Sequence, residues 1–185
     1  MYKIRSVWGK INLSNVSQRF DMGRSKTVQQ LQAQWVSSEN FRRYGQVIFA
    51  SVDGKGYDVE DAQLNLQNGI PRFYIMRLEK RGRKFHKITR HQQCTQCLGS
   101  LDGKDWLIAV CPPHNDVSEP ALEEIAAFRI PGNCFIKLHE GTWHAGPHFD
   151  HEAVDFYNLE LADTNVVDHF THDFFKSHEL EFEMV

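Results

Sequence analysis

The chain has 185 residues, a formal net charge of −3 at pH 7 and a hydrophobic fraction of 41%. These values are ordinary for a globular domain that buries its own core, and the small negative charge excludes a general attraction to nucleic acid or to an anionic membrane. No apolar run approaches the roughly twenty residues of a membrane-spanning helix, and four cysteines are too few for a disulfide scaffold. We therefore expect a cytoplasmic protein with no nucleic-acid or membrane partner.

The N-terminal segment has a different composition from the rest of the chain, with four lysine and arginine residues before its first acidic residue, Asp21. It contains no continuous apolar region of the kind that signal peptides have. We expect residues 1–30 to form an N-terminal extension and residues 31–185 to form the folded domain. An organellar transit peptide and a natural start at Met22 are alternatives that the composition leaves open.

Six segments have the length and the apolar or alternating pattern of β-strands. They are Gln46–Val52, Phe73–Leu78, Lys84–Thr89, Trp106–Cys111, Cys134–His139 and Val154–Leu161. Turn-forming residues separate them, which predicts a mainly β fold, either a barrel or a sandwich. The basic sequence KRGRK at residues 80–84 lies between the second and third segments and predicts a hairpin with a solvent-exposed turn.

Two short helices are expected beside the strands. Ser37–Tyr44 begins with a capping serine and ends before Gly45. Glu119–Phe128 carries Pro120 in its first turn. The aromatic residues near the C-terminus predict a tail that packs as a strap on the β structure, and we expect His169 to belong to that strap.

Histidine is frequent, with ten residues, and imidazole is both an acid–base group near neutral pH and a metal ligand. Four residues separate His91 from Gln96, and two separate Gly141 from His144. These spacings resemble the two metal-binding motifs of the cupin superfamily of β-barrels, although Thr89 stands where the first motif has a histidine and Gln96 where it has a glutamate. The resemblance implies that His91, Gln96 and His144 are the ligands if a metal binds.

A narrower resemblance covers the chain from about residue 31 onward. It rests on FRRYGQVI (41–48), NGI (68–70) with Arg72 just after, RHQQCTQ (90–96), AAFRIPG (126–132), LHEGTWHAGP (138–147) and VDFYNLE (154–160). In these segments the chain resembles the ureidoglycolate lyase family, whose members have a cupin-like β-barrel of the jelly-roll type with a few short helices. The chain departs from the family's common residues at Asn65, Thr89 and Ala145, which bears on the exact substrate more than on the fold.

The resemblance implies cleavage of ureidoglycolate to glyoxylate and urea, a C–N cleavage of the amidine-lyase type in allantoin breakdown and purine catabolism. The central carbon of the substrate carries a hydroxyl, a ureido group and a carboxylate. A base removes the hydroxyl proton, the C–N bond breaks, and an acid protonates the departing nitrogen. A divalent metal would lower the pKa of the hydroxyl. The family resemblance implies nickel as the metal. Zinc and iron also suit imidazole ligands, and a reaction without metal stays open.

The residue types suggest further roles in this reaction. His139 is the preferred general acid–base, together with His144, and Asp155 would orient a histidine or act as the base. Arg72 would bind the substrate carboxylate through its two-pronged guanidinium. Trp143 would form a wall of the pocket.

The histidines and Gln96 are expected to meet in one place. We expect His91, Gln96, His139 and His144 to converge in a single pocket at the mouth of the barrel, with Arg72 reaching in from a neighbouring strand. Without metal, these polar side chains would hydrogen-bond the substrate.

Each assignment has a structural alternative. The two histidines of residues 138–147 could be core residues with satisfied hydrogen bonds, Arg72 could form a surface ion pair, and Asp155 could be an edge charge. The functional alternative is a non-catalytic cupin-like protein that binds or senses a small carboxylate. The family resemblance also implies a homodimer.

Overall fold

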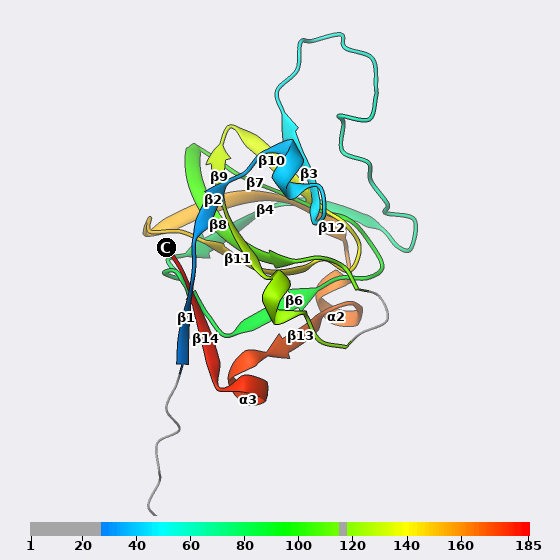
Figure 1. Cartoon of the computed structure of the whole chain (residues 1–185). Coiled ribbons are helices and arrows are strands. Elements are labelled where there is room, and N and C mark those ends of the chain that lie inside the picture. The colour runs from blue at the N-terminus through cyan, green and yellow to red at the C-terminus, as the bar shows by residue number, and fades with distance from the viewer. Residues whose placement is uncertain (1–26, 115–117) are drawn as a thin grey trace, which may run out of the picture.

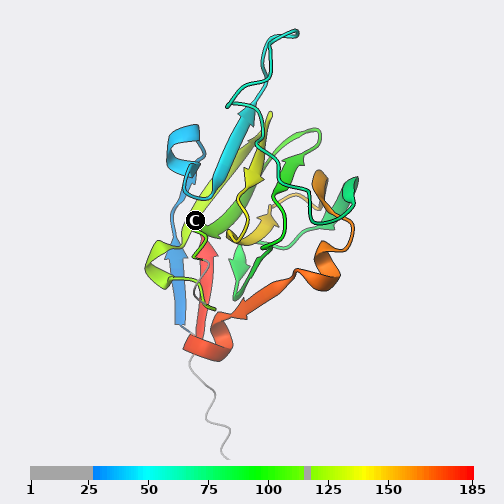
Figure 2. The same cartoon turned by 90° about the vertical axis from the view of Figure 1, so that its right-hand side faces the viewer.

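The structure, a computed structural model, describes residues 27–114 and 118–185 (Figure 1). Two large β-sheets face each other, and a smaller sheet lies beside them (Figure 2). Residues 1–26 of the expected N-terminal extension lie outside the described residues. The expected boundary at residue 30 falls inside the first strand, β1, Thr27–Leu31.

One large sheet has five antiparallel strands in the order β3-β10-β7-β12-β4. Their bounds are Gly45–Phe49 for β3, Cys134–Leu138 for β10, Gln96–Ser100 for β7, Ala153–Leu161 for β12 and Pro71–Glu79 for β4. β12 pairs with β4 along its whole length.

The other large sheet has six strands in the order β13-β6-β11-β8-β9-β2. Their bounds are Phe170–Asp173 for β13, Lys87–Arg90 for β6, Trp143–His148 for β11, Gly103–Cys111 for β8, Ala126–Gly132 for β9 and Ala33–Trp35 for β2. Only β2 and β9 are parallel among these pairs of described strands.

The small sheet joins the two ends of the described chain. In it β1 pairs in parallel with β14, Leu180–Met184, and β14 pairs with β5, Lys84–Phe85. The helices are short: α1 is Ser38–Phe41, α2 is Thr164–Val167, α3 is Phe174–His178, and a 3-10 turn spans Leu122–Glu124. None of the described helices is long and apolar enough to cross a membrane.

Apolar side chains fill two layers. The main core lies between the two large sheets and includes Phe41, Ile136 and Phe156. A second cluster covers the other face of the six-stranded sheet and includes Phe174 and Phe182, from α3 and β14. The expected mainly β, cupin-like fold is therefore confirmed, and the tail packs against the sheet as expected. The sheets face each other without closing into a continuous barrel in the described part of the chain.

The inward face of the five-stranded sheet changes from apolar to polar along its strands. On β12 the inward residues are Val154, Phe156, Asn158 and Glu160, and all four are buried. A buried polar side chain needs a hydrogen-bonding partner or a ligand. The polar end of this face therefore marks where the core gives way to a site.

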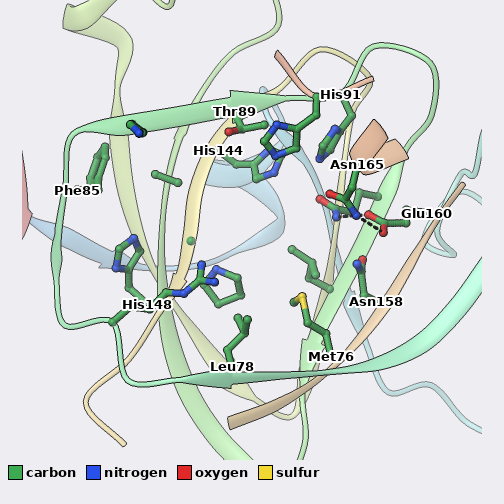
Figure 3. Close-up of a pocket in the computed structure, with 18 of the residues that line it drawn as sticks. Met76, Leu78, Phe85, Thr89, His91, His144, His148, Asn158, Glu160 and Asn165 are labelled. Carbon is green, nitrogen blue, oxygen red and sulfur yellow. Dashed lines mark hydrogen bonds between the residues drawn. The ribbon is translucent and has the colours of Figure 1, made fainter. Parts of the chain in front are cut away.

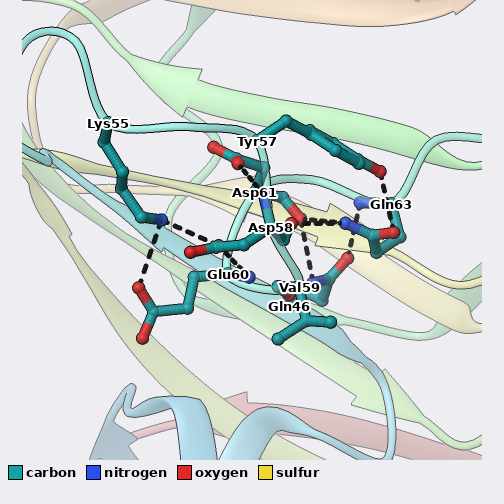
Figure 4. A network of polar contacts seen from close by, with 8 residues as sticks. All are labelled: Gln46, Lys55, Tyr57, Asp58, Val59, Glu60, Asp61 and Gln63. Carbon is teal, nitrogen blue, oxygen red and sulfur yellow. Dashed lines mark hydrogen bonds and ion pairs between the residues drawn. The ribbon is translucent and has the colours of Figure 1, made fainter.

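A long segment between β3 and β4 extends from the sheet (Figure 1) and then folds back onto β3, where polar contacts hold it (Figure 4). The Gln46 side chain holds it there, because its Nε2 donates to the carbonyls of Val59 and Asp61 at 3.2 Å and its Oε1 accepts the N–H of Gln63 at 2.8 Å. Farther along, the Asn65 carbonyl accepts the N–H of residue 95 at 3.0 Å. The segment thereby fixes the start of β7, where Gln96 lies.

The expected helix at Glu119–Phe128 is wrong. The structure has only the 3-10 turn there, followed by strand β9. Phe128 packs into the main core and Ala127 into the second cluster, so both faces of β9 are apolar. A continuous apolar run of this kind fits a buried helix as well as a strand buried on both faces. The expected helix at Ser37 does form, with Ser37 and Asn40 capping each other, and it ends at Phe41.

The expected hairpin around Gly82 is also wrong. β4 pairs with β12, while β5 pairs with β14, so the basic segment crosses from a large sheet to the small one. Arg83 forms an ion pair with Asp150 at the crossing. The sequence pattern identified the strands but carried no information about which distant strands would pair with them.

Candidate active site

A cavity of about 500 Å³ lies between the two large sheets at the polar end of the inward face. Its walls come from β4, β7 and β12 on one side and from β6 and β11 on the other, with residues 81–87 joining them (Figure 3). The predicted residues His91, Gln96 and His144 all line it. The structure therefore brings together three residues that lie far apart in the sequence.

His91 and His144 face each other in this cavity, with ring centroids 5.1 Å apart. His91 directly follows β6, and His144 lies opposite Thr89 in the pairing of β11 with β6. The Nδ1 atom of His91 lies 2.5 Å from the Asp168 carbonyl, and that of His144 lies 3.2 Å from the Thr142 carbonyl. A carbonyl only accepts, so each Nδ1 donates its proton and each Nε2 keeps a free lone pair.

Asp168 fixes the position of His91 in two ways. Its carbonyl accepts the imidazole N–H, and its buried carboxylate accepts the backbone N–H groups of Gln92 and Gln93 at 2.7–2.9 Å. Asp168 lies directly after α2, so the segment that follows β12 holds the end of β6. Such a second contact fixes both the tautomer and the orientation of an imidazole.

Burial keeps both imidazoles neutral. It lowers the pKa of His144 to about 3, with a further contribution from His91. Burial also lowers the pKa of His91, while the hydrogen bond to Asp168 and the charge of Glu160 act in the opposite direction. Both rings are therefore neutral at pH 7, and Asp168 and Glu160 favour proton uptake at His91.

Glu160 lies at the centre of a buried hydrogen-bond network that sequence reasoning missed. Its side chain is 1% exposed. The carboxylate accepts from Gln96 Nε2 at 2.9 Å, from the Tyr74 hydroxyl at 3.2 Å and from Asn165 Nδ2 at 3.1 Å. The Tyr74 oxygen in turn accepts from Asn158 Nδ2 at 3.0 Å. The network fixes the amide groups of Gln96 and Asn158 in one orientation.

Two amide oxygens in the cavity wall have no hydrogen-bond partner among the described residues. They are Oε1 of Gln96 and Oδ1 of Asn158, and both are fully buried. An unpaired buried acceptor costs about 1–3 kcal/mol, so such an atom in a pocket wall is often reserved for a ligand. The two oxygens can accept hydrogen bonds from N–H or O–H groups of a bound molecule.

The structure does not bring His139 or Asp155 into the cavity. His139 directly follows β10 and does not line the large cavity, and its Nδ1 lies 3.0 Å from Lys137 Nζ. It does border a small void beside that cavity, together with His91, Gln96 and His144. Asp155 is on the outward face of β12, where both carboxylate oxygens accept from Arg77 at 2.8 Å. The ion pair with Arg77 lowers the pKa of Asp155. Alternation along β12 explains the position of Asp155.

Trp143 and Arg72 also lie outside the cavity lining. Trp143 precedes His144 on β11 and therefore faces the second apolar cluster, where the Arg90 guanidinium lies 4.5 Å from its ring centroid. Arg72 lies two residues from the cavity residue Tyr74, and its guanidinium stacks 3.7 Å above the Tyr74 ring. Arg72 is exposed, so it covers the Tyr74 side of the Glu160 hydrogen-bond network from the solvent.

The sequence contained a signal for the missed residues. Asn158 and Glu160 occupy the same face of β12 as Val154 and Phe156, which are apolar. Polar residues that continue a buried strand face are costly unless they are paired or bind a ligand. Tyr74 could be found only after the register of β4 with β12 was known, because it is opposite Asn158.

The donor set for a metal is incomplete. No group of three or more His, Cys, Asp or Glu side chains in residues 27–114 and 118–185 is arranged to hold a metal ion. The expected ligands supply two imidazole nitrogens and the neutral amide oxygen of Gln96, and a neutral amide binds nickel, zinc or iron weakly. These residues do not fit a tightly held ion. A bound metal stays a prediction, and the proposed reaction does not depend on it.

The facing sheets and the enclosed polar cavity define a cupin-like β protein with a site of small-molecule size. A family model described as Ureidoglycolate lyase matches residues 28–177. The chain belongs to the ureidoglycolate lyase family, whose name describes a lyase activity.

The other comparisons add little. Comparison with curated proteins finds no match. Among solved structures, the chain is similar to a dTDP sugar isomerase from Desulfovibrio desulfuricans G20, at 10% identity and a TM-score of 0.43. The similarity covers 70% of this chain and 81% of that chain, and at this level it carries no argument about function.

Proposed function

We propose that the protein cleaves ureidoglycolate to glyoxylate and urea, and that it does so in the cavity between the two large sheets. Membership of the family supports the reaction. The observation that supports this location is the pair of neutral imidazoles, His91 and His144, beside the unpartnered amide oxygens of Gln96 and Asn158. A purely regulatory carboxylate-binding protein, the alternative considered from the sequence, is not favoured by the family match.

The reaction moves one proton within the substrate. The hydroxyl loses its proton, its oxygen forms a carbonyl with the central carbon, and the C–N bond breaks with its electron pair going to nitrogen. The nitrogen then takes up the proton to give urea. One base that accepts the hydroxyl proton and returns it to nitrogen therefore suffices, and no covalent intermediate or external reductant is needed.

His91 is the proposed proton carrier. Its Nε2 lone pair is free, and Asp168 holds the ring in the tautomer that can accept a proton. The negative charge of Glu160 favours the imidazolium that forms after proton transfer. His144, which stays neutral, would accept a hydrogen bond from the substrate and keep water out of the space between the rings.

The two unpartnered oxygens suit the ureido group. That group presents N–H donors on both nitrogens, and Gln96 Oε1 and Asn158 Oδ1 are buried acceptors without a donor. Glu160 fixes Gln96 through the Nε2 donor and Asn158 indirectly through Tyr74. Pairing these acceptors with the substrate would remove the cost of leaving them unsatisfied. It would also select a ureido group over an ester, which has no donor to offer.

The test is direct turnover. Purified full-length protein is mixed with (S)-ureidoglycolate, and glyoxylate and urea are measured together. The proposal predicts equal amounts of the two products at a rate well above the spontaneous one. Ammonia in place of urea, or no release above the spontaneous rate, would contradict it. The cytoplasmic location and the place of the reaction in allantoin breakdown stay predictions.

We also propose that the protein is a homodimer. Part of the outward face of the five-stranded sheet is apolar, with Phe73 66% exposed and Ile75 57% exposed. Tyr157 stacks between Phe73 and Phe135 on this face, at centroid distances of 5.6 and 5.8 Å. A contiguous exposed aromatic patch on a sheet is typical of a protein interface.

A further inference from the structure

The cavity has two chemically different ends. Figure 3 shows His91, His144, Asn165 and Glu160 at one end, while Phe85 and His148 lie at the other. Apolar side chains of β4 form the wall between the ends. The proposed cleavage chemistry uses only the first end.

The second end lies beyond the reach of ureidoglycolate. His144 and His148 are four residues apart on β11. A regular strand would separate their Cα atoms by about 13 Å, and the irregularity of β11 between Ala145 and His148 shortens this distance. Their side chains lie at opposite ends of the cavity (Figure 3). Ureidoglycolate is roughly 6 Å long at ordinary bond lengths. A substrate seated between His91 and His144 therefore leaves the second end unfilled.

Positive charge gathers at this second end. The cavity lining includes Arg81, Lys84 and Lys87, all from the segment that crosses between the sheets, and its only carboxylate is Glu160 at the opposite end. Arg81 lies close enough to His148 for its charge to lower the pKa of that imidazole. An anion in this position would be attracted by several cations that converge from one side.

Arg81 is left without a counter-ion, and Lys87 has only Asp173 opposite it on β13, whose pKa its charge helps to lower. Other basic residues of the same segment are paired, namely Arg77 with Asp155, Lys80 with Glu152, Arg83 with Asp150 and Lys84 with Glu183. Within residues 27–114 and 118–185, Arg81 and Lys87 form no ion pair. Lys84 also lines the cavity but is paired with Glu183, so Arg81 is the lining cation whose charge is left for a ligand.

His148 adds a buried group to the same end. Its side chain is 6% exposed, and its Nδ1 donates to the Gly82 carbonyl at 3.1 Å. Its Nε2 therefore has no proton when the ring is neutral. Burial lowers the pKa of His148, and a bound anion would act in the opposite direction. Protonated His148 could then donate Nε2–H to the anion.

We propose that Arg81, Lys87 and His148 form a second subsite of the cavity, which binds a carboxylate or phosphate group. The group is either the distal end of a ligand longer than ureidoglycolate or a separate small anion held beside the substrate. This inference does not depend on the cleavage reaction, because binding at the subsite is measured without turnover.

The experiment compares three small anions by calorimetry on the full chain: butyrate, glutarate and inorganic phosphate. We expect glutarate to bind about tenfold more tightly than butyrate, since it carries the second carboxylate that a guanidinium can hold with two hydrogen bonds. Arg81→Gln should remove this tenfold preference and weaken phosphate binding by a similar factor. Arg77→Gln, which removes the same charge outside the cavity, should retain both.

Two further measurements make the result decisive. The ring signals of His148 in an NMR spectrum should move when phosphate is added to the wild type and stay unmoved in Arg81→Gln. Arg81→Lys keeps the charge and should keep most of the phosphate affinity, which separates loss of the subsite from loss of the fold. Phosphate that binds together with butyrate points to a separate anion, and phosphate that competes with butyrate points to a single ligand whose carboxylate occupies the subsite.

The inference is overturned by either of two results. One is that glutarate and phosphate bind Arg81→Gln as tightly as the wild type. The other is that Arg77→Gln loses as much affinity as Arg81→Gln, which would mean that only the general charge of the segment matters.

Discussion

His91 and His144 face each other in the cavity with ring centroids 5.1 Å apart, and each donates its Nδ1 proton to a backbone carbonyl. The arrangement places two free Nε2 lone pairs in one buried space, where neither ring is charged at neutral pH. Two uncharged imidazoles can lie this close because burial disfavours the protonated form of each, and the neighbouring His91 adds to this effect on His144.

Acidification should therefore destabilise the fold through His144. Its pKa is about 3 in the folded chain and 6.5 when unperturbed, so the unfolded chain binds a proton that the folded chain does not. The free energy of unfolding should be highest above pH 6.5 and fall by about 2 kcal/mol between pH 7 and pH 5 from this residue alone. Urea unfolding at a series of pH values measures the slope.

His144→Gln provides the comparison for that slope. It should flatten the pH dependence of the urea midpoint, whereas His151→Gln, at an exposed histidine, should leave the dependence unchanged. An identical slope in the wild type and in His144→Gln would show that the two rings are not held neutral by burial.

Glu160→Gln should damage both stability and turnover. An amide at this position presents N–H donors to the donors of Gln96 and Asn165, so a buried group loses its partner at a cost of about 1–3 kcal/mol. The amides of Gln96 and Asn158 would also lose their fixed orientation, which should lower kcat/KM for ureidoglycolate. Thermal unfolding and glyoxylate release measure the two effects.

Glu152→Gln is the matched control for Glu160→Gln, because the Glu152 side chain is 93% exposed. It should leave both the melting temperature and kcat/KM close to the wild-type values. Equal effects of the two substitutions would mean that the buried network has no special role.

Removal of divalent metal should leave the activity in place. The expected ligands supply two imidazoles and one neutral amide oxygen, a set that binds nickel weakly. Protein dialysed against a chelator should release glyoxylate at the rate of untreated protein, and added nickel should change that rate by less than twofold. Loss of activity on chelation with recovery on nickel addition would instead establish His91, Gln96 and His144 as metal ligands.

A charge on the apolar part of the outward face of the five-stranded sheet should dissociate the homodimer. Ile75→Glu places a carboxylate beside the Phe73–Tyr157 stack, where an interface would have to bury it unpaired. Light scattering should report a dimer for the wild type and a monomer for Ile75→Glu. Val166→Glu, at an exposed residue of α2, should remain dimeric, and a monomeric wild type would refute the assembly.

Local sequence patterns predicted the strands better than their partners. Alternation within one segment located β4, β10 and β12, and a short continuous apolar run located β8. A two-residue period did not identify β9 as a strand, because β9 is buried on both faces. It could not predict that β5 pairs with β14, which lies about a hundred residues later in the chain, because pairing partners are set by the assembled sheets.

For the site, too, local motifs were informative in the sequence, whereas contacts between distant residues were not. The resemblance of their spacing to the cupin motifs predicted that His91, Gln96 and His144 would lie together, and all three line the cavity. The same expectation placed His139 and Arg72 there, and neither lines it. Strand parity was already informative for His139, which has the parity of Lys137 rather than that of the core residues of β10. The role of Glu160 could not be predicted, because its partner Gln96 lies 64 residues away and meets it only through the pairing of β12 with β7.

The central claim is that catalysis depends on the imidazole pair in the cavity rather than on the histidine outside it. The most direct test compares glyoxylate release from ureidoglycolate by His91→Gln and by His139→Gln. Glutamine at position 91 can still donate to the Asp168 carbonyl, so the fold should hold while the proton acceptor is lost. We predict that His91→Gln lowers kcat by at least about 100-fold and that His139→Gln stays within twofold of the wild type. A large loss in His139→Gln with near-normal turnover in His91→Gln would contradict the account.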